Sequence, residues 1–177
     1  MITLIVGGVR SGKSRYAQAL AKEAENVVFL ATAEAADDEM RAKIARHRRE
    51  RPETWKTVEV PIDLDAAITQ YGRECELLIV DCLTTFTANV LAADGDNHDQ
   101  VLARVERICT ALKQTGASVV LVSNEVGSGI VPAYPSGRQF RDLLGEINQR
   151  VAELADRVVF MVAGCSMVIK GTAEVSQ

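Results

Sequence analysis

The chain has 177 residues, of which 47% are hydrophobic and 25% charged, and its formal net charge is −4. This size and composition are typical of one globular domain, so we predict a single domain over residues 1–177. The negative charge gives no general attraction for nucleic acid or an anionic membrane, and no apolar run approaches the roughly 20 residues that a membrane span needs. The chain starts directly in an apolar strand and not in a secretory leader, which favours the cytoplasm.

The cysteines give a second indication of the compartment. Cys75, Cys82, Cys109 and Cys165 lie far apart and form no C-x-x-C pair. Such spacing is unlike a zinc site or a disulfide framework. We therefore expect buried, reduced thiols.

Apolar runs and amphipathic segments alternate along the whole chain. Strands are predicted at residues 2–6, 27–31, 57–60, 77–81, 119–122, 157–163 and 166–169. Helices are predicted at about 15–22, 37–51, 63–71, 86–91, 99–114 and 137–155. Strands that are apolar throughout, separated by helices, predict a mostly parallel sheet covered on both faces. Because only a short turn at Gly164 joins the last two strands, that pair should be antiparallel and form the C-terminal edge.

The strongest motif lies between the first strand and the first helix. It reads Gly7-Gly8-Val9-Arg10-Ser11-Gly12-Lys13-Ser14 and fits the pattern G-x-x-x-x-G-K-[ST] without a mismatch. The glycines let successive N–H groups point into one nest, and the helix N-terminus adds partial positive charge. Lys13 should reach the β- and γ-phosphates of a nucleoside triphosphate, and the Ser14 hydroxyl should hold Mg²⁺. Motif and context together predict a three-layer α/β fold of the P-loop NTPase type, RecA-like in its sheet.

A carboxylate follows the fourth predicted strand. Asp81 occupies the place of a Walker B residue, which helps to position Mg²⁺. An acidic residue at a strand end is common, so this signal is weak on its own. The carboxyl edge of the sheet, where α/β proteins bind ligands, should also hold residues 31–33 and 124–127 as pocket walls. Any one of these residues could equally belong to an ordinary strand-to-helix loop that binds no ligand.

The chain has two histidines. His98 lies in a polar loop and is expected to be solvated. Helical spacing places Ile44, His47, Arg48 and Arg51 on one side of a helix. Guanidinium groups grip phosphate oxygens bidentately, and an imidazole between them can attack a phosphorus atom and carry the nucleotide as a phosphoramidate. From spacing alone, a solvated basic helix face is the favoured explanation of the pattern.

Several longer blocks of sequence together resemble one protein family. Besides residues 7–14, they are Ile44-x-x-His47-x-x-x-Arg51-Pro52-x-x-Trp55-x-Thr57-x-Glu59, Asp81-Cys82-Leu83-Thr84 with Asn89, the run from Ser123 to Pro132, and the run from Gly137 to Gln149. In this order they closely resemble the bifunctional adenosylcobinamide kinase/adenosylcobinamide-phosphate guanylyltransferase family of cobalamin synthesis. The second and fourth blocks are far more specific than the phosphate loop.

The resemblance implies two transferase reactions. ATP or GTP phosphorylates adenosylcobinamide, and GTP then donates GMP to adenosylcobinamide-phosphate, which gives adenosylcobinamide-GDP and pyrophosphate. Lys13 serves catalysis in both steps, and the histidine that becomes guanylylated falls on His47. The nucleotide contacts fall on Gly7, Gly8, Val9, Arg10, Ser11, Gly12, Lys13, Ser14, Ala31, Thr32, Ala33, Arg48, Arg49, Glu50, Arg51, Glu59 and Asp81. The family also implies a homo-oligomer, with a trimer as the first expectation.

Within this resemblance Glu59 has a specific expected role. A carboxylate can accept hydrogen bonds from guanine N1–H and N2–H₂, a donor pair that adenine lacks. The residues alone would place Glu59 on a strand surface. Apolar side chains at residues 131–135 are a candidate docking surface for the corrin ring.

Two other functions fit part of the pattern. One is a P-loop kinase of another small hydroxylated metabolite, in which His47 only binds phosphate. The other is a RecA-like regulatory or DNA-associated ATPase, against which the acidic charge balance and the lack of an extra basic domain argue.

Overall fold

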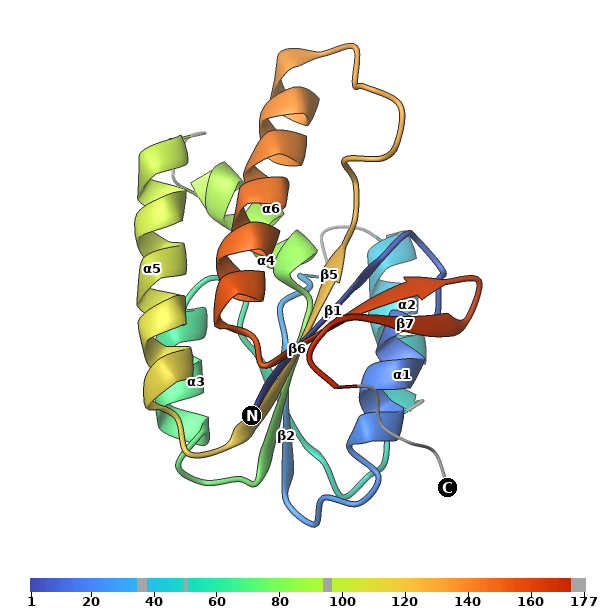
Figure 1. Cartoon of the computed structure of the whole chain (residues 1–177), viewed down its shortest axis with the longest axis vertical. Coiled ribbons are helices and arrows are strands. Elements are labelled where there is room, and N and C mark those ends of the chain that lie inside the picture. Colours follow the sequence, from blue (N-terminus) through green and yellow to red (C-terminus); the bar gives the residue numbers. More distant parts are fainter. Residues whose placement is uncertain (35–37, 50, 94–96, 173–177) are drawn as a thin grey trace.

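One seven-stranded sheet organises the protein (Figure 1). The computed structural model describes residues 1–34, 38–49, 51–93 and 97–172. The strands are β1 (Ile2–Gly7), β2 (Val27–Ala31), β3 (Lys56–Glu59), β4 (Leu77–Asp81), β5 (Ser118–Asn124), β6 (Arg157–Val162) and β7 (Cys165–Lys170). They lie in the order β3-β2-β4-β5-β1-β6-β7, and all neighbours are parallel except the pair β6 and β7. The predicted α/β class and the antiparallel C-terminal edge are confirmed.

Helices connect the strands as the pattern predicted. They are α1 (Lys13–Leu20), α2 (Asp38–Arg49), α3 (Leu64–Tyr71), α4 (Leu83–Ala93), α5 (His98–Gln114) and α6 (Pro135–Leu154). Four of them start earlier than predicted, among them α1 at Lys13 and not Arg15, and α5 at His98 and not Asp99. Helix α4 begins at Leu83 and not near Phe86, and α6 begins at Pro135, where the fixed φ of proline suits a first helical turn.

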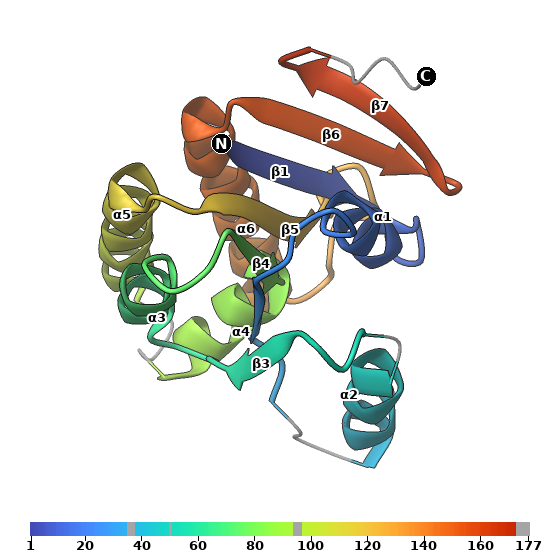
Figure 2. The ribbon, with the colours of Figure 1, turned by 90° about the horizontal axis from the view of Figure 1, so that it is seen from below.

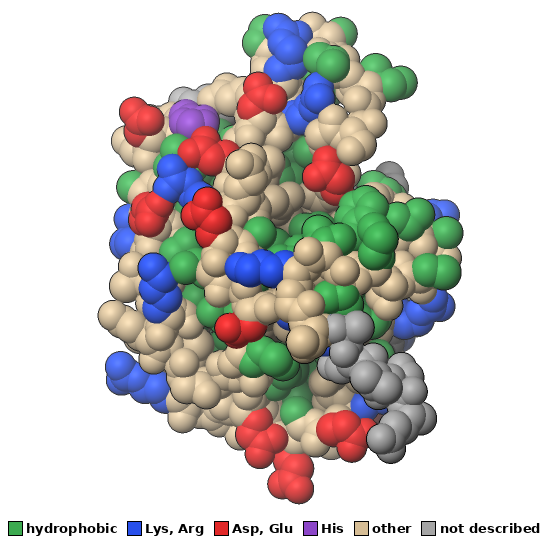
Figure 3. Space-filling model, viewed as in Figure 1, with side chains coloured by type: hydrophobic (Ala, Val, Ile, Leu, Met, Phe, Trp, Pro, Cys, Tyr) green, Lys and Arg blue, Asp and Glu red, His purple; other side chains and the backbone are tan. Residues whose placement is uncertain are grey.

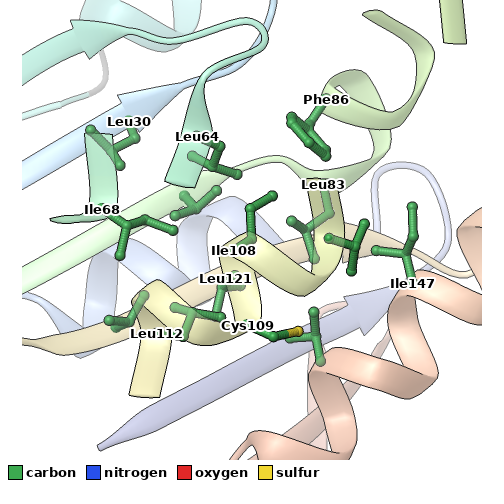
Figure 4. Close-up of a cluster of buried hydrophobic side chains, with 14 of the residues drawn as sticks. Leu30, Leu64, Ile68, Leu83, Phe86, Ile108, Cys109, Leu112, Leu121 and Ile147 are labelled. Atoms are coloured by element: carbon green, nitrogen blue, oxygen red, sulfur yellow. The ribbon is translucent and has the colours of Figure 1, made fainter. Parts of the chain in front are cut away.

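The helices cover the sheet in unequal layers. Helices α3, α4, α5 and α6 lie on one face, and α1 and α2 lie on the other (Figure 2). Phe86, Ile108 and Ile147, from three helices, meet Leu30 and Leu121 of the sheet in the larger core (Figure 4). On the opposite face Ala17 of α1 packs with strand residues. Both faces of the central strands are therefore buried, which explains their continuous apolar runs.

The turn between β6 and β7 places the sheet edge beside the phosphate loop. Ala163 and Gly164 both have positive φ values, 50° and 83°, as a two-residue hairpin turn requires. The Gly164 N–H donates a hydrogen bond of 3.0 Å to the Ser11 carbonyl oxygen. The hairpin thus supports the loop from the side of the sheet edge.

Apolar side chains gather on this hairpin and reach solvent (Figure 3). Val162, Met167 and Ile169 are 53%, 55% and 58% exposed.

The four cysteines are free thiols. Cys109 is buried, but Cys165 is exposed because it begins the edge strand, so the expectation of buried thiols is wrong there. Among the described residues, no helix combines the length and the apolar character needed to cross a membrane.

Candidate active site

The phosphate loop leaves β1 and enters α1 as the motif predicted. Gly12 has a φ of 97° and stands at the N-terminus of α1, a conformation that glycine adopts without a Cβ clash. Gly7 lies against β6, where an added Cβ would come within 2.4 Å of the Met161 carbonyl oxygen. The two positions therefore need glycine for different reasons, one for its dihedral angle and one for a close approach.

Lys13 lies inside the loop. Its ammonium donates hydrogen bonds of 3.0 and 2.6 Å to the Gly7 and Gly8 carbonyl oxygens. The side chain is buried, and burial lowers the Lys13 pKa, an effect that the nearby Cys82 and Asp81 oppose. A polyphosphate would supply the negative charge that favours the ammonium form.

Ser14 and Asp81 bring two oxygen groups together at the start of α1. The Ser14 hydroxyl donates a hydrogen bond of 2.8 Å to the Asp81 carboxylate. Adjacent ligands of an octahedral Mg²⁺ ion lie about 2.9 Å apart when each bond is about 2.1 Å. A hydroxyl and a carboxylate at this separation fit the hard-oxygen preference of Mg²⁺, so the residues present suit the predicted ion.

A cavity of about 1090 Å³ opens beside the loop. Its walls come from the loop and α1, from the ends of β2, β3, β4 and β5, and from α2. Predicted site residues that line it are Val9, Arg10, Ser11, Gly12, Lys13, Ser14, Ala31, Ala33, His47, Arg48, Arg51, Glu59 and Asp81. Segments that are far apart in the sequence therefore meet at one carboxyl edge.

Helix α2 forms the wall opposite the loop. Ile44, His47, Arg48 and Arg51 all line the cavity, as the helical spacing predicted. Arg51 lies just beyond the helix, which ends at Arg49, and its N–H donates to the Arg48 carbonyl oxygen at 3.3 Å. Positive charge in the last helical turn is favoured by the helix dipole. This end of the cavity is strongly basic.

Strand β3 contributes the remaining wall. Thr57 and Glu59 line the cavity and pair with Phe29 and Ala31 of β2. The Arg51 guanidinium lies over the Phe29 ring, 3.6 Å from its centroid, a cation–π arrangement. A carboxylate, a hydroxyl and an aromatic–guanidinium pair thus occur close together at the end of the cavity away from α1.

Some predicted contacts lie outside the cavity walls. Gly7 and Gly8 accept the Lys13 hydrogen bonds from beneath the loop. Arg49 is exposed and donates to the Ala45 carbonyl oxygen of its own helix at 3.3 Å. Glu50 lies outside the described residues. The predicted nucleotide contacts of these residues stay predictions.

Thr32 is fully buried. Its hydroxyl donates to the Cys82 carbonyl oxygen at 2.7 Å and accepts from the Cys82 N–H at 2.8 Å. Asn89 of α4 donates to the carbonyl oxygens of Thr32 and Pro61, at 2.8 and 3.2 Å. These bonds tie the ends of β2, β3 and β4 together, so Thr32 acts on the cavity by holding its floor.

Other lining residues were not predicted. They include Thr57, Thr85, Ala163 and Gly164. Thr57 carries no chemical signal in a single sequence. The turn at Ala163 and Gly164 reaches the cavity because β6 lies beside β1, and that strand order is the signal that would have revealed it. Of the expected wall at residues 124–127, Asn124 lines the cavity.

The sequence matches a known family over nearly its whole length. Residues 3–169 fit the family described as "Cobinamide kinase / cobinamide phosphate guanyltransferase". The chain belongs to this family. The match spans the P-loop, the Asp81 strand and the residues that line the cavity between them.

Curated relatives agree with the family match. The "Bifunctional adenosylcobalamin biosynthesis protein CobU" of Escherichia coli is 39% identical, and the protein of the same name from Salmonella typhimurium is 41% identical; each alignment covers 96% of this chain and 100% of the relative. The "Bifunctional adenosylcobalamin biosynthesis protein CobP" of Pseudomonas aeruginosa is 41% identical over 97% of this chain and 98% of the relative.

A solved structure shares the fold at low identity. It is an ATPase from the type III secretion system of pathogenic bacteria, with a TM-score of 0.59 and 13% identity. The match covers 90% of this chain, which spans about half (50%) of the ATPase chain. This likeness supports the predicted P-loop ATPase-type α/β fold.

Proposed function

We propose that this protein is a bifunctional transferase. It phosphorylates adenosylcobinamide with a nucleoside triphosphate, and it then transfers GMP from GTP to adenosylcobinamide-phosphate through His47. Family membership and the names of the curated relatives support the pair of reactions. The observation that carries the proposal is that one cavity is lined both by the phosphate loop and by His47, Arg48 and Arg51.

In the first step the loop positions the triphosphate for attack on its γ-phosphorus. The oxygen of the acceptor hydroxyl forms the new bond, the bond between the γ-phosphorus and its bridging oxygen breaks, and the nucleoside diphosphate leaves. Lys13 turns from the loop carbonyls to the phosphate oxygens and stabilises their charge. Ser14 and Asp81 would hold Mg²⁺, which offsets negative charge on the phosphates.

In the second step an imidazole nitrogen of His47 attacks the α-phosphorus of GTP. Pyrophosphate leaves, and a phosphate oxygen of adenosylcobinamide-phosphate then attacks the same phosphorus and releases the imidazole. Arg48 and Arg51 hold phosphate oxygens during this exchange. The imidazole must come within about 3–3.5 Å of the α-phosphorus.

One loop serving two attack geometries requires different nucleotide poses or a movement of α2. We favour movement of α2. Its described side chains are mostly exposed, with Ile44 and His47 only partly buried, so few contacts oppose a displacement.

The acceptor and the assembly are further parts of the proposal. Val131 and Tyr134, which are 58% and 65% exposed, follow β5 and offer an apolar surface to the corrin ring.

We also propose a cytoplasmic homo-oligomer, with a trimer as the state expected from the family. The exposed apolar side chains of the β6–β7 hairpin give such an assembly a surface to bury (Figure 3). Light scattering on the purified protein measures the state.

Labelling tests the covalent step directly. Incubation of the wild-type protein with α-³²P-labelled GTP, followed by denaturing electrophoresis, should leave an acid-labile label on the chain because the phosphoramidate survives denaturation at neutral pH. Label from γ-³²P-GTP should not be retained. A kinase of another metabolite would retain neither label, and DNA-stimulated hydrolysis would instead favour a regulatory ATPase.

Substitution of Glu59 tests the selection of guanine. The Glu59→Gln variant replaces one acceptor oxygen by an NH₂ group, which faces a guanine donor. We expect kcat/KM for guanylyl transfer from GTP to fall by about 10- to 10²-fold, since a hydrogen bond to a charged acceptor is lost. Initial rates over a range of GTP concentrations measure the change.

Glu53→Gln is the matched control, because Glu53 is an exposed carboxylate on the segment that leads into β3 and does not line the cavity. Wild-type GTP kinetics in the Glu59→Gln variant would contradict the role of Glu59.

A further inference from the structure

Asn124 stands where β5 meets the phosphate loop. Its Cα pairs with Gly7 in the sheet, and Val122, two residues earlier, pairs with Asp81. Because alternate residues of a strand point to the same face, Asn124 follows Val122 and Asp81 to the face that carries α1. Asn124 accordingly lines the cavity together with Lys13.

The backbone at this position is held from three sides. The Asn124 N–H donates a hydrogen bond of 2.8 Å to the Thr84 hydroxyl of α4. The Asn124 carbonyl oxygen accepts a bond of 3.1 Å from the Asn148 amide of α6. The next residue, Glu125, donates its N–H to the Gly7 carbonyl oxygen at 3.0 Å. Two helices and β1 therefore fix one strand end.

The side chain, in contrast, is uncommitted. The Asn124 amide makes no hydrogen bond to any described part of the chain, although the residue is half-buried. The residue lines the cavity, and a fixed backbone with an unbonded amide is the arrangement that preorganised binding needs. A ligand in the cavity is the natural partner of this amide.

The order of the strands in the sheet indicates which part of the ligand the Asn124 amide contacts. Glu59 and Arg51 lie toward the β3 edge, whereas Asn124 lies between β4 and β1, next to the loop that holds phosphates. We propose that the Asn124 amide N–H contacts an oxygen of the terminal phosphate, and that Asn124 is a catalytic residue of phosphoryl transfer but not of guanylyl transfer. Thr84 and Asn148 are its positioning residues. This assignment rests on the proposed function.

The chemistry requires no proton from the amide. As the acceptor oxygen bonds to the γ-phosphorus and the bond to the β-phosphate breaks, negative charge redistributes over the γ-oxygens, and the hydroxyl proton passes to solvent. A neutral amide donor stabilises that charge without repelling Lys13. The α-phosphorus attacked by His47 lies two phosphates away, so the amide has no comparable effect there.

The test separates the two half-reactions in the full-length protein. With γ-³²P-ATP and adenosylcobinamide, the Asn124→Ala variant should lose about 10²-fold in kcat, as for the loss of one preorganised donor. Its KM for ATP should change by less than about threefold, since the interaction strengthens mainly in the transition state. Formation of the His47 adduct from α-³²P-GTP should stay near the wild-type rate.

Further variants control for folding and position. The backbone bonds to Asn124 do not use its side chain, so the isosteric Asn124→Asp variant should fold; its charge should lower kcat at least as far as alanine does. Asn148→Ala should lower kcat less, again with KM nearly unchanged. Gln149→Ala removes an exposed amide from the same helix and should have no effect.

The outcomes distinguish this inference from the proposed function. Wild-type kcat in the Asn124→Ala and Asn124→Asp variants overturns the inference, and so does an equal loss of adduct formation and kinase activity. A wild-type protein that shows neither reaction overturns the proposed function itself.

Discussion

The His47→Ala variant should form no acid-labile GMP adduct. The proposed adduct is a bond between an imidazole nitrogen and the α-phosphorus, and alanine has no atom that can form it. Guanylyl transfer to adenosylcobinamide-phosphate should fall by at least about 10³-fold, as when a covalent nucleophile is removed. Phosphorylation of adenosylcobinamide should continue, because Lys13 and the loop remain. Label from α-³²P-GTP and product from γ-³²P-ATP measure the two effects on one preparation.

His98→Ala is the matched control. His98 is the other histidine of the chain, and it lies at the start of α5 near Glu146, at 3.5 Å, outside the cavity. The His98→Ala variant should retain as much label from α-³²P-GTP as the wild type. An undiminished adduct in His47→Ala would exclude His47 as the nucleophile, whereas loss of both activities would mean that the α2 wall is needed for nucleotide binding as a whole.

The Lys13→Ala variant should lose both half-reactions. The ammonium is already buried in the loop, where it bonds to the Gly7 and Gly8 carbonyl oxygens, so it loses little further hydration when it binds phosphates. We expect a loss of about 10²–10³-fold in each rate, comparable to removal of a main electrostatic contact. Single-turnover labelling and the kinase assay measure the two rates.

A structural loss must be separated from a catalytic one, because Lys13 also bonds to Gly7 and Gly8. Thermal unfolding of Lys13→Ala reports any loosening of the loop. Lys22→Ala removes an exposed lysine that follows α1 and should leave both rates intact. Normal turnover of Lys13→Ala in either half-reaction would disprove a shared phosphate site.

Local patterns carried much of the prediction. The loop motif predicted the conformation of the loop, because its glycines and Lys13 lie within one short segment. Continuous apolar runs identified the strands because both faces of the sheet are covered. The antiparallel pair followed from the short turn expected at Gly164, which the structure shows to consist of Ala163 and Gly164.

Other features depend on neighbours that a single sequence does not specify. Spacing placed His47 on one side of a helix but favoured a solvated basic face, and only the long block with Trp55 and Glu59 pointed to a nucleophile. Thr32 counted as a ligand contact by position, yet its hydroxyl bonds to Cys82 because β2 lies beside β4. Asn124 was expected as a pocket wall. The hydrogen bonds from its backbone to Thr84 and Asn148 were not predictable, because they depend on how α4 and α6 pack against the sheet.

The segment from the end of β2 through β3 carries both His47 and Glu59, for which two separate functions are proposed. His47 lies in α2 and Glu59 ends β3, whereas Lys13 begins α1 and Asp81 ends the central strand β4. Strand β3 has four residues and pairs only with β2 among the described strands. A base that Glu59 does not accept would therefore leave the imidazole misaligned with the phosphorus. We expect discrimination between purines to appear in the speed of bond formation, and not only in how tightly each nucleotide is held.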